Sequence, residues 1–167
     1  LGAFIAISLR NPHGEWDAWM TWNMLARFIF RGGDNWRVMF SDSSSLRHPD
    51  YPLLVPSLVP PGWSYAGSEL PTVPILLALI FTCATVALVC SALAVLRMRS
   101  QGLLAGLVLI GTPFFITHGA SQYADVPVGL YLAATLVLLC LHDRYGASTK
   151  GFLLLAGVAA GLAAWTK

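Results

Sequence analysis

The chain has 167 residues, of which 56% are hydrophobic and 11% are charged. Soluble domains carry about 25% charged residues, so this composition excludes an ordinary soluble domain and favours a lipid bilayer as the partner of the chain. The net charge of +2 is small, and the ten Lys and Arg residues are scattered along the chain. That pattern argues against a nucleic-acid-binding surface.

The first part of the chain is predicted to be the end of one membrane span followed by a long polar loop. Residues 1–9 are apolar, but a complete span needs about 20 helical residues. Because the chain begins and ends within apolar runs, we expect it to be a piece of a longer protein, with 1–9 as the tail of its first span. Residues 10–70 then form a connecting segment that contains short juxtamembrane helices.

Four further spans follow, over residues 74–96, 103–117, 126–141 and 151–167. The first of these has no charged residue between Glu69 and Arg97, and Pro113 is expected to bend or end the second. Residues 126–141 are short for a span, at roughly 24 Å. The sequence therefore predicts an all-α fold, a single polytopic bundle of transmembrane helices. The three cysteines lie in apolar runs without ligand spacing and predict neither disulfide nor zinc.

The short loops predict how the bundle is oriented. The connections at 97–101 and 142–150 must lie on one side of the membrane, and they contain Arg97, Arg99, Arg144 and Lys150. The short opposite loop at 118–125 contains no Lys or Arg, so the positive-inside rule places the basic loops in the cytoplasm. Seven of the eight acidic residues then lie outside, and only Asp143 lies inside.

Three of the external acids are candidates for chemistry. Glu15 and Asp17 flank Trp16 just beyond the first span, in a segment that we expect to form a short helix along the membrane surface. The tryptophans there are ordinary interfacial anchors, whereas two carboxylates at the interface are less ordinary. Asp125 precedes the run at 126–141 and is expected to cap that helix; a carboxylate fixed there can also orient a base or bind a metal.

The remaining candidates would contact substrate. Lys167 follows the last apolar run at its outer end, where it is either a snorkelling cation or a contact to a lipid phosphate. His48, Asp50 and Tyr51 lie in a proline-rich stretch that continues through Pro61. Each proline restrains itself and its predecessor, so we expect a rigid loop here that shapes a substrate rim. A glycine-rich nucleotide loop is not predicted, since residues 32–33 follow no strand.

These motifs resemble the C superfamily of integral-membrane glycosyltransferases, which includes protein O-mannosyltransferases and bacterial lipid A aminoarabinose transferases. Four segments carry the resemblance: the acidic motif EWDAW at 15–19, the His-Pro stretch at 48–56, the sequence YADVP at 123–127, and the ending GLAAWTK at 161–167. They occur in the expected order and on the expected side of the membrane. The first motif differs from that of the O-mannosyltransferases, in which the two acids are adjacent.

The resemblance implies transfer of a sugar from a polyprenyl-phosphate carrier to a lipid, glycan or protein acceptor outside the cytoplasm, with inversion at the anomeric carbon. Asp17 would be the general base and Glu15 the alternative base. Asp125 would position the acceptor or support Asp17, and Lys167 would hold the donor phosphate. No cofactor is required, although a divalent cation bound by Glu15, Asp17 and Asp125 stays open. The implied location is a bacterial inner membrane.

A polytopic transporter is the alternative prediction. Asp125 and Lys167 would then be substrate or proton sites. Transporters place such charges near the middle of the bilayer, whereas the apolar runs of this chain contain no acidic or basic residue. This pattern favours the enzyme.

Overall fold

The computed structural model describes residues 1–40, 50–146 and 150–167, and in this part of the chain it contains helices and no strands. The prediction of an all-α fold is confirmed. The helices are α1 Gly2–Arg10, a π-helical turn at Ala18–Trp22, α2 Asn23–Gly32, a 3-10 segment at Gly33–Phe40, α3 Leu54–Ala66, α4 Thr72–Leu96, α5 Arg99–Ile110, α6 Pro113–Ala120, α7 Asp125–Tyr145 and α8 Lys150–Thr166.

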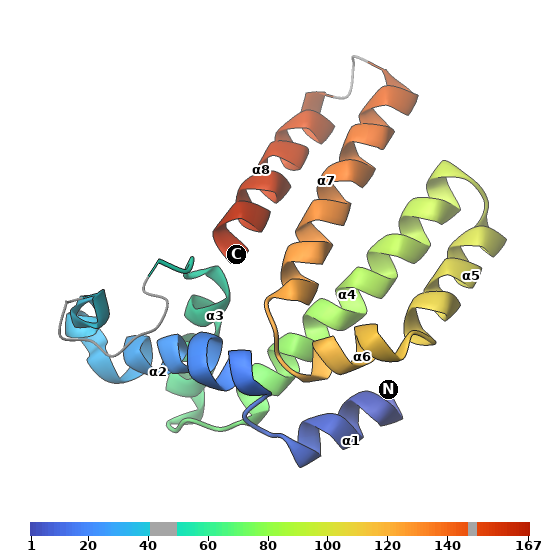
Figure 1. Ribbon diagram of the computed structural model, residues 1–167. Helices are drawn as coiled ribbons and strands as arrows, with labels where there is room; N and C mark the ends of the chain where they lie inside the picture. Colours follow the sequence, from blue (N-terminus) through green and yellow to red (C-terminus); the bar gives the residue numbers. More distant parts are fainter. Residues whose placement is uncertain (41–49, 147–149) are drawn as a thin grey trace.

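Two antiparallel helix pairs form the body of the molecule, α4 with α5 and α7 with α8, and α4 also packs against α7 (Figure 1). The turn between α4 and α5 lies at the same end of the molecule as the C-terminus of α7 and the N-terminus of α8 (Figure 1). Helices α1, α2, α3 and α6 gather at the opposite end (Figure 1). The basic residues Arg97, Arg99, Arg144 and Lys150 are therefore all at one end, and the polar N-terminal segment is at the other.

Two helices, α4 and α7, are long and apolar enough to cross a membrane, and α5 with α6 makes a third candidate if the pair is one broken span. The axes of α5 and α6 differ by 65°. The bend falls where Thr112 is extended and Pro113 begins α6, because proline has no N–H with which to continue α5. Helix α7 runs on to Tyr145, four residues beyond the predicted 126–141. The shorter apolar helix α8 covers the run at 151–167.

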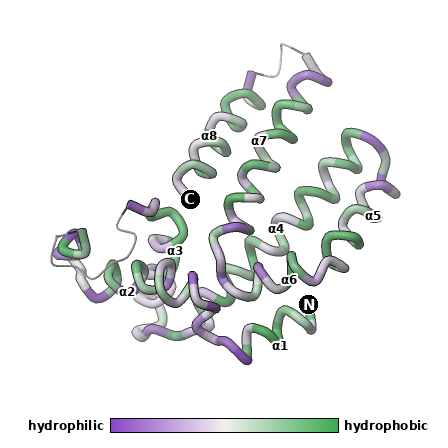
Figure 2. The backbone as a smooth tube through the Cα atoms, viewed as in Figure 1, coloured by the Kyte–Doolittle hydropathy of each residue, from purple (hydrophilic) through white to green (hydrophobic). Residues whose placement is uncertain are grey.

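The apolar surfaces of these helices face outward. Only 17% of the apolar window of α4 and 11% of that of α7 are buried within the chain. Large side chains such as Ile80, Leu107, Leu136 and Leu154 are exposed, and hydrophobic residues run along α4, α5, α7 and α8 with hydrophilic ones near the helix ends (Figure 2). So much exposed apolar surface is unfavourable in water and is compatible with a bilayer.

The proline-rich stretch corrects one prediction. Residues 54–66 form helix α3 and not the predicted rigid loop. Pro56 lies in the first turn, where no N–H partner is needed. Pro60 and Pro61 lie inside the helix and each remove a hydrogen bond, but part of α3 is buried, and Val59 and Trp63 pack against residues of α2 and α4. Tertiary packing outweighs the local cost of the prolines.

An ion pair fixes α2 to the connection between α3 and α4. The guanidinium of Arg31 donates two hydrogen bonds to the carboxylate of Glu69, at 2.6 and 2.8 Å. The Nε atom of Arg27 lies 3.4 Å from Oε2 of the same carboxylate. The hydrogen bonds from Arg31 lower the pKa of Glu69 below its usual value; the charges of Arg31 and Arg27 add to this, and burial opposes it. The carboxylate therefore stabilises this end of the fold in its ionised form.

Replacing Glu69 by Gln is expected to lower the thermal unfolding temperature at neutral pH by a small amount, because partly exposed pairs are screened by solvent. The folded-state pKa is the lowered one, so the stabilisation is present above 4.5, the usual value, and is lost as the pH falls through the lowered value. Thermal unfolding in detergent at several pH values measures this. The difference between wild type and variant should shrink in acid, while the exposed control Asp143→Asn should show no such trend.

Candidate functional site

A small pocket at the α1–α3 end is lined by residues from the N-terminal part of the sequence and by Lys167. It has a volume of about 90 Å³ and is lined by Trp16, Asp17, Met20, Thr21, Trp22, Tyr51 and Lys167. Asp17 precedes the π-helical turn, and its carboxylate makes no hydrogen bond to cap that turn. Lys167 directly follows α8. The pocket thus combines one carboxylate, one ammonium and one phenol, three groups that the sequence had singled out separately.

Lys167 is also bound to Asp125. Its ammonium donates a hydrogen bond of 2.8 Å to the carboxylate of Asp125, the first residue of α7, and the side chains are 41% and 44% exposed. Because α7 and α8 are antiparallel neighbours, the end of one lies beside the start of the other (Figure 1). The hydrogen bond from Lys167 to Asp125 raises the pKa of Lys167, with smaller contributions from Tyr51 and Asp17, so the ammonium stays charged.

Tyr51 is placed by stacking on a buried tryptophan. The rings of Tyr51 and Trp22 are 5.4 Å apart between centroids and 24° from parallel, and Trp22 packs in a core cluster with Val55 and Ala124. Tyr51 therefore lines the pocket together with Asp17 and Lys167. Asp50 is exposed and does not line the pocket, and the third predicted rim residue, His48, lies outside the described residues.

Glu15 occupies a different place from Asp17. Its carboxylate accepts a hydrogen bond from Asn11 at 3.2 Å, its backbone N–H donates to the carbonyl of Ser121 at 3.2 Å, and it does not line the pocket. Of the two acids that the sequence left as alternatives for a base, only Asp17 shares a pocket with Lys167. The geometry therefore favours Asp17.

Tyr123 lies near the acidic residues without lining the pocket, and the sequence did not single it out. Burial raises the pKa of its phenol, and the charges of Asp17, Glu15 and Asp125 raise this pKa further. A hydrogen bond from the backbone of Asp17 has the opposite, smaller effect and lowers it. All three acids are thus close enough to Tyr123 to act on its ionisation, although they reach it from two separate segments. The sequence signal for Tyr123 was its place at the start of the YADVP segment, two residues before Asp125.

The three acids do not form a metal site in the described part of the chain. Among residues 1–40, 50–146 and 150–167, no three His, Cys, Asp or Glu side chains are grouped so that they could hold a metal ion. Asp17 lines the pocket, Asp125 is bound to Lys167, and Glu15 is bound to Asn11, so the three carboxylates do not converge on one point as ligands must.

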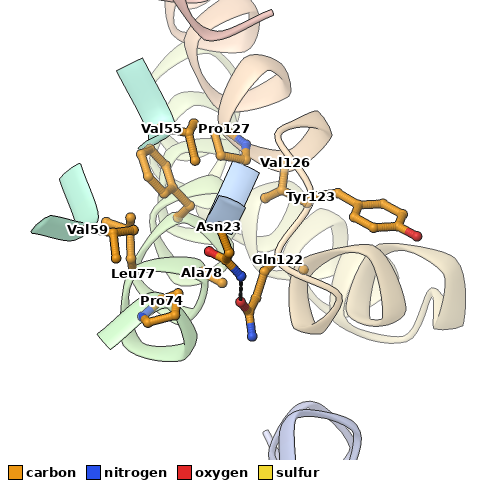
Figure 3. A pocket seen from close by; sticks show the side chains of 12 residues that line it. Asn23, Val55, Val59, Pro74, Leu77, Ala78, Gln122, Tyr123, Val126 and Pro127 are labelled. Carbon is orange, nitrogen blue, oxygen red and sulfur yellow. Dashed lines mark hydrogen bonds between the residues drawn. The ribbon is translucent and has the colours of Figure 1, made fainter. Parts of the chain in front are cut away.

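Buried amides join the two acid-bearing segments beside a second pocket, which is the one drawn in Figure 3 and whose lining includes Asn23 and Gln122. The side chain of Asn23 donates a hydrogen bond of 2.7 Å to the side chain of Gln122 (Figure 3). Asn23 also donates to the carbonyl of His13 at 3.0 Å, and Gln122 donates to the carbonyl of Pro12 at 3.2 Å. Neither amide was singled out from the sequence. Their partners are far apart in the chain, so no local pattern could have shown the contact.

The same junction requires a glycine at position 14. Gly14 has a φ of +77°, and a Cβ built there would lie 2.5 Å from the Cβ of Ala18 and 2.8 Å from the carbonyl oxygen of Ser121. Both the backbone conformation and the close approach exclude a side chain. Gly67 is a useful comparison, since it has a φ of +70° but nothing within 4 Å of such a Cβ.

Gly14→Ala is expected to cost about 2–5 kcal/mol of folding free energy, combining the strain of a left-handed residue with overpacking. Gly67→Ala carries only the strain and should cost about 1–2 kcal/mol. Thermal unfolding of the two variants in one detergent provides the measurement. Equal losses would show that segment 11–15 is not packed against Ser121 as described.

Comparisons of the chain with protein-family models, curated proteins and solved structures found no match.

Proposed function

We propose that the protein is a membrane glycosyltransferase that moves a sugar from a polyprenyl-phosphate-linked donor to an acceptor, as members of the C superfamily do. The observation that carries this proposal is the shared pocket of Asp17 and Lys167 at one end of a group of apolar helices. A carboxylate can accept a proton from a hydroxyl group, and an ammonium can hold a phosphate. The apolar helices beside them suit a lipid carrier.

The proposed reaction is a single displacement at the anomeric carbon. The acceptor hydroxyl attacks this carbon, its proton passes to the carboxylate of Asp17, and the bond between the carbon and the phosphate oxygen breaks. The lipid phosphate leaves with the electron pair, and the configuration of the sugar is inverted. Lys167 stabilises the negative charge that develops on the leaving phosphate.

Asp125 supports this reaction through its contact with Lys167. The 2.8 Å hydrogen bond holds the ammonium at the pocket in the absence of donor. The sequence had suggested that Asp125 positions the acceptor or assists Asp17; the contact with Lys167 supports a role in orienting the phosphate-binding group. Because both side chains are partly exposed, an anionic donor can reach the ammonium without displacing buried structure.

The proposed location is the extracytoplasmic side of a bacterial inner membrane. The site lies at the end of the helices opposite Arg97, Arg99, Arg144 and Lys150 (Figure 1), and the positive-inside rule assigns those residues to the cytoplasm. Nucleotide sugars are cytoplasmic, so an enzyme that acts on the outer side needs a sugar that is carried across on a lipid. This requirement fits the phosphate-binding role of Lys167.

A transfer assay tests the proposal. The protein in lipid nanodiscs is given a polyprenyl phosphate bearing a radiolabelled sugar, together with a membrane extract as acceptor source. Loss of label from the carrier and its appearance in another product are expected, and a nucleotide sugar should not replace the donor. If the wild-type protein leaves the carrier intact while proteoliposomes accumulate a labelled solute, the transporter is the correct alternative.

A further inference from the structure

A buried clasp connects the segment before Asp17 to the turn before Asp125. We define the clasp as the side chains of Asn23 and Gln122 with the carbonyls of Pro12 and His13, joined by three hydrogen bonds of 2.7, 3.0 and 3.2 Å. Asn23 is 3% exposed and Gln122 is 6% exposed. Figure 3 shows the two amides meeting directly, with Val126 and Pro127 above them.

The backbone of Gln122 is strained. Its φ of +61° makes it the only residue other than glycine with a positive φ in the described ranges. A residue with a Cβ is sterically disfavoured in this conformation, whereas glycine is not. The hydrogen bonds of the Gln122 side chain have to offset this cost, and such outliers cluster where geometry matters for function.

The clasp acts on both parts of the site. The backbone N–H of Glu15 donates to the carbonyl of Ser121 at 3.2 Å, so the two chain segments remain in contact up to two residues before Asp17. On the other segment, Tyr123 follows Gln122 directly, and Asp125 begins α7 two residues later. A change in the clasp therefore moves Asp17 relative to Tyr123 and to the Lys167–Asp125 pair.

We propose that Gln122 is a positioning residue, whose amide sets the separation between the Asp17 carboxylate and the Lys167–Asp125 pair. This inference rests on the proposed function, because the separation matters for a reaction that needs a base and a phosphate contact on one substrate. Gln122 does not touch the substrate. It acts by holding Pro12 and Asn23, and an apolar side chain of the same size would leave both with unpaired buried groups.

Gln122→Gly isolates this role, since glycine accepts the φ of +61° and removes both side-chain hydrogen bonds. In nanodiscs, hydrogen exchange of the peptide covering residues 11–17 should become faster, while exchange in α4 stays unchanged. In the transfer assay, kcat should fall on the order of 10²-fold from misplacement of the base. The KM for the lipid donor should change little, because Asp125 still holds Lys167.

Asn23→Ala provides a second variant that breaks the clasp from the other side. Asn23→Ala should also speed hydrogen exchange of residues 11–17 and lower kcat. The double variant should show no faster exchange and no lower kcat than either single variant, because both substitutions break the same contact. Thr85→Val is the matched control: Thr85 is a buried residue in α4 whose hydroxyl donates to the carbonyl of Phe81. Loss of this hydroxyl should leave both kcat and the hydrogen exchange of residues 11–17 unchanged.

The outcomes separate the clasp from the proposed function. If hydrogen exchange of residues 11–17 is unchanged in both variants, the clasp does not hold the two segments together, whatever the activity. Faster exchange with an unchanged kcat shows a purely structural contact and overturns the positioning role. A wild-type protein that transfers no sugar refutes the proposed function and with it the role of Gln122 in catalysis, while the exchange measurement still decides whether the clasp holds the two segments.

Discussion

Asp17→Asn is expected to reduce kcat of sugar transfer by about 10²- to 10⁴-fold, the range for removal of a general base. Asparagine has nearly the same shape but cannot take the proton of the acceptor hydroxyl. The side chain is exposed and does not cap the following π-helical turn, so the loss should not come from unfolding. The measurement is single-turnover transfer from a labelled polyprenyl-phosphate sugar.

Asp34→Asn is the matched control for this variant, since Asp34 is an exposed acid in the same polar segment and lies outside the pocket. It should transfer sugar at the wild-type rate. Glu15→Gln separates the two acids of the EWDAW motif. If Glu15→Gln abolished transfer while Asp17→Asn retained it, the assignment of the base would be reversed.

Lys167→Ala is expected to reduce kcat/KM for the lipid donor roughly 10- to 150-fold. This range corresponds to the loss of a charge-assisted hydrogen bond of about 1.5–3 kcal/mol. Because Asp125 is 44% exposed, water can solvate its carboxylate when the ammonium is removed, and the fold should survive. Binding of polyprenyl phosphate and steady-state transfer would both be measured.

Lys150→Ala is the control on the same helix. Lys150 begins α8 and Lys167 follows its last residue, so the two cations lie at opposite ends. Lys150→Ala should leave donor binding unchanged, and Lys167→Arg should keep a large part of it because the positive charge remains. Equal weakening by both alanine variants would point to a general effect of charge and against a phosphate contact at Lys167.

The overall helical character followed from composition and hydrophobic run length. Charge-free stretches such as 74–96 are strong signals for an apolar helix, and Pro113 marked the bend between α5 and α6. Helix α3 was missed because its prolines oppose a helix locally. Its stability comes from burial of Val59 and Trp63 against α2 and α4, which the local sequence does not contain.

Asp17 and Lys167 were predicted as site residues and both line the pocket, whereas Glu15 and Asp50 were predicted and do not; the supporting contacts were not predicted. Asp17 and Lys167 stand out because charges next to apolar runs are costly unless they have a role. The sequence could not show that Asp125 pairs with Lys167, since that contact depends on how α7 and α8 pack. Asn23, Gln122 and Tyr123 were missed for the same reason, because amides and phenols are common and only their tertiary partners distinguish them.

Ligand protection shows whether the pocket lined by Asp17 and Lys167 binds a lipid phosphate. Met20 lines the pocket and carries no charge, so Met20→Cys in a background with Cys83, Cys90 and Cys140 replaced by alanine places a reporter there. The rate of modification by a water-soluble thiol reagent should fall when polyprenyl phosphate is added and should not fall with the uncharged polyprenol. An identical rate with and without polyprenyl phosphate would show that the pocket does not bind a lipid phosphate.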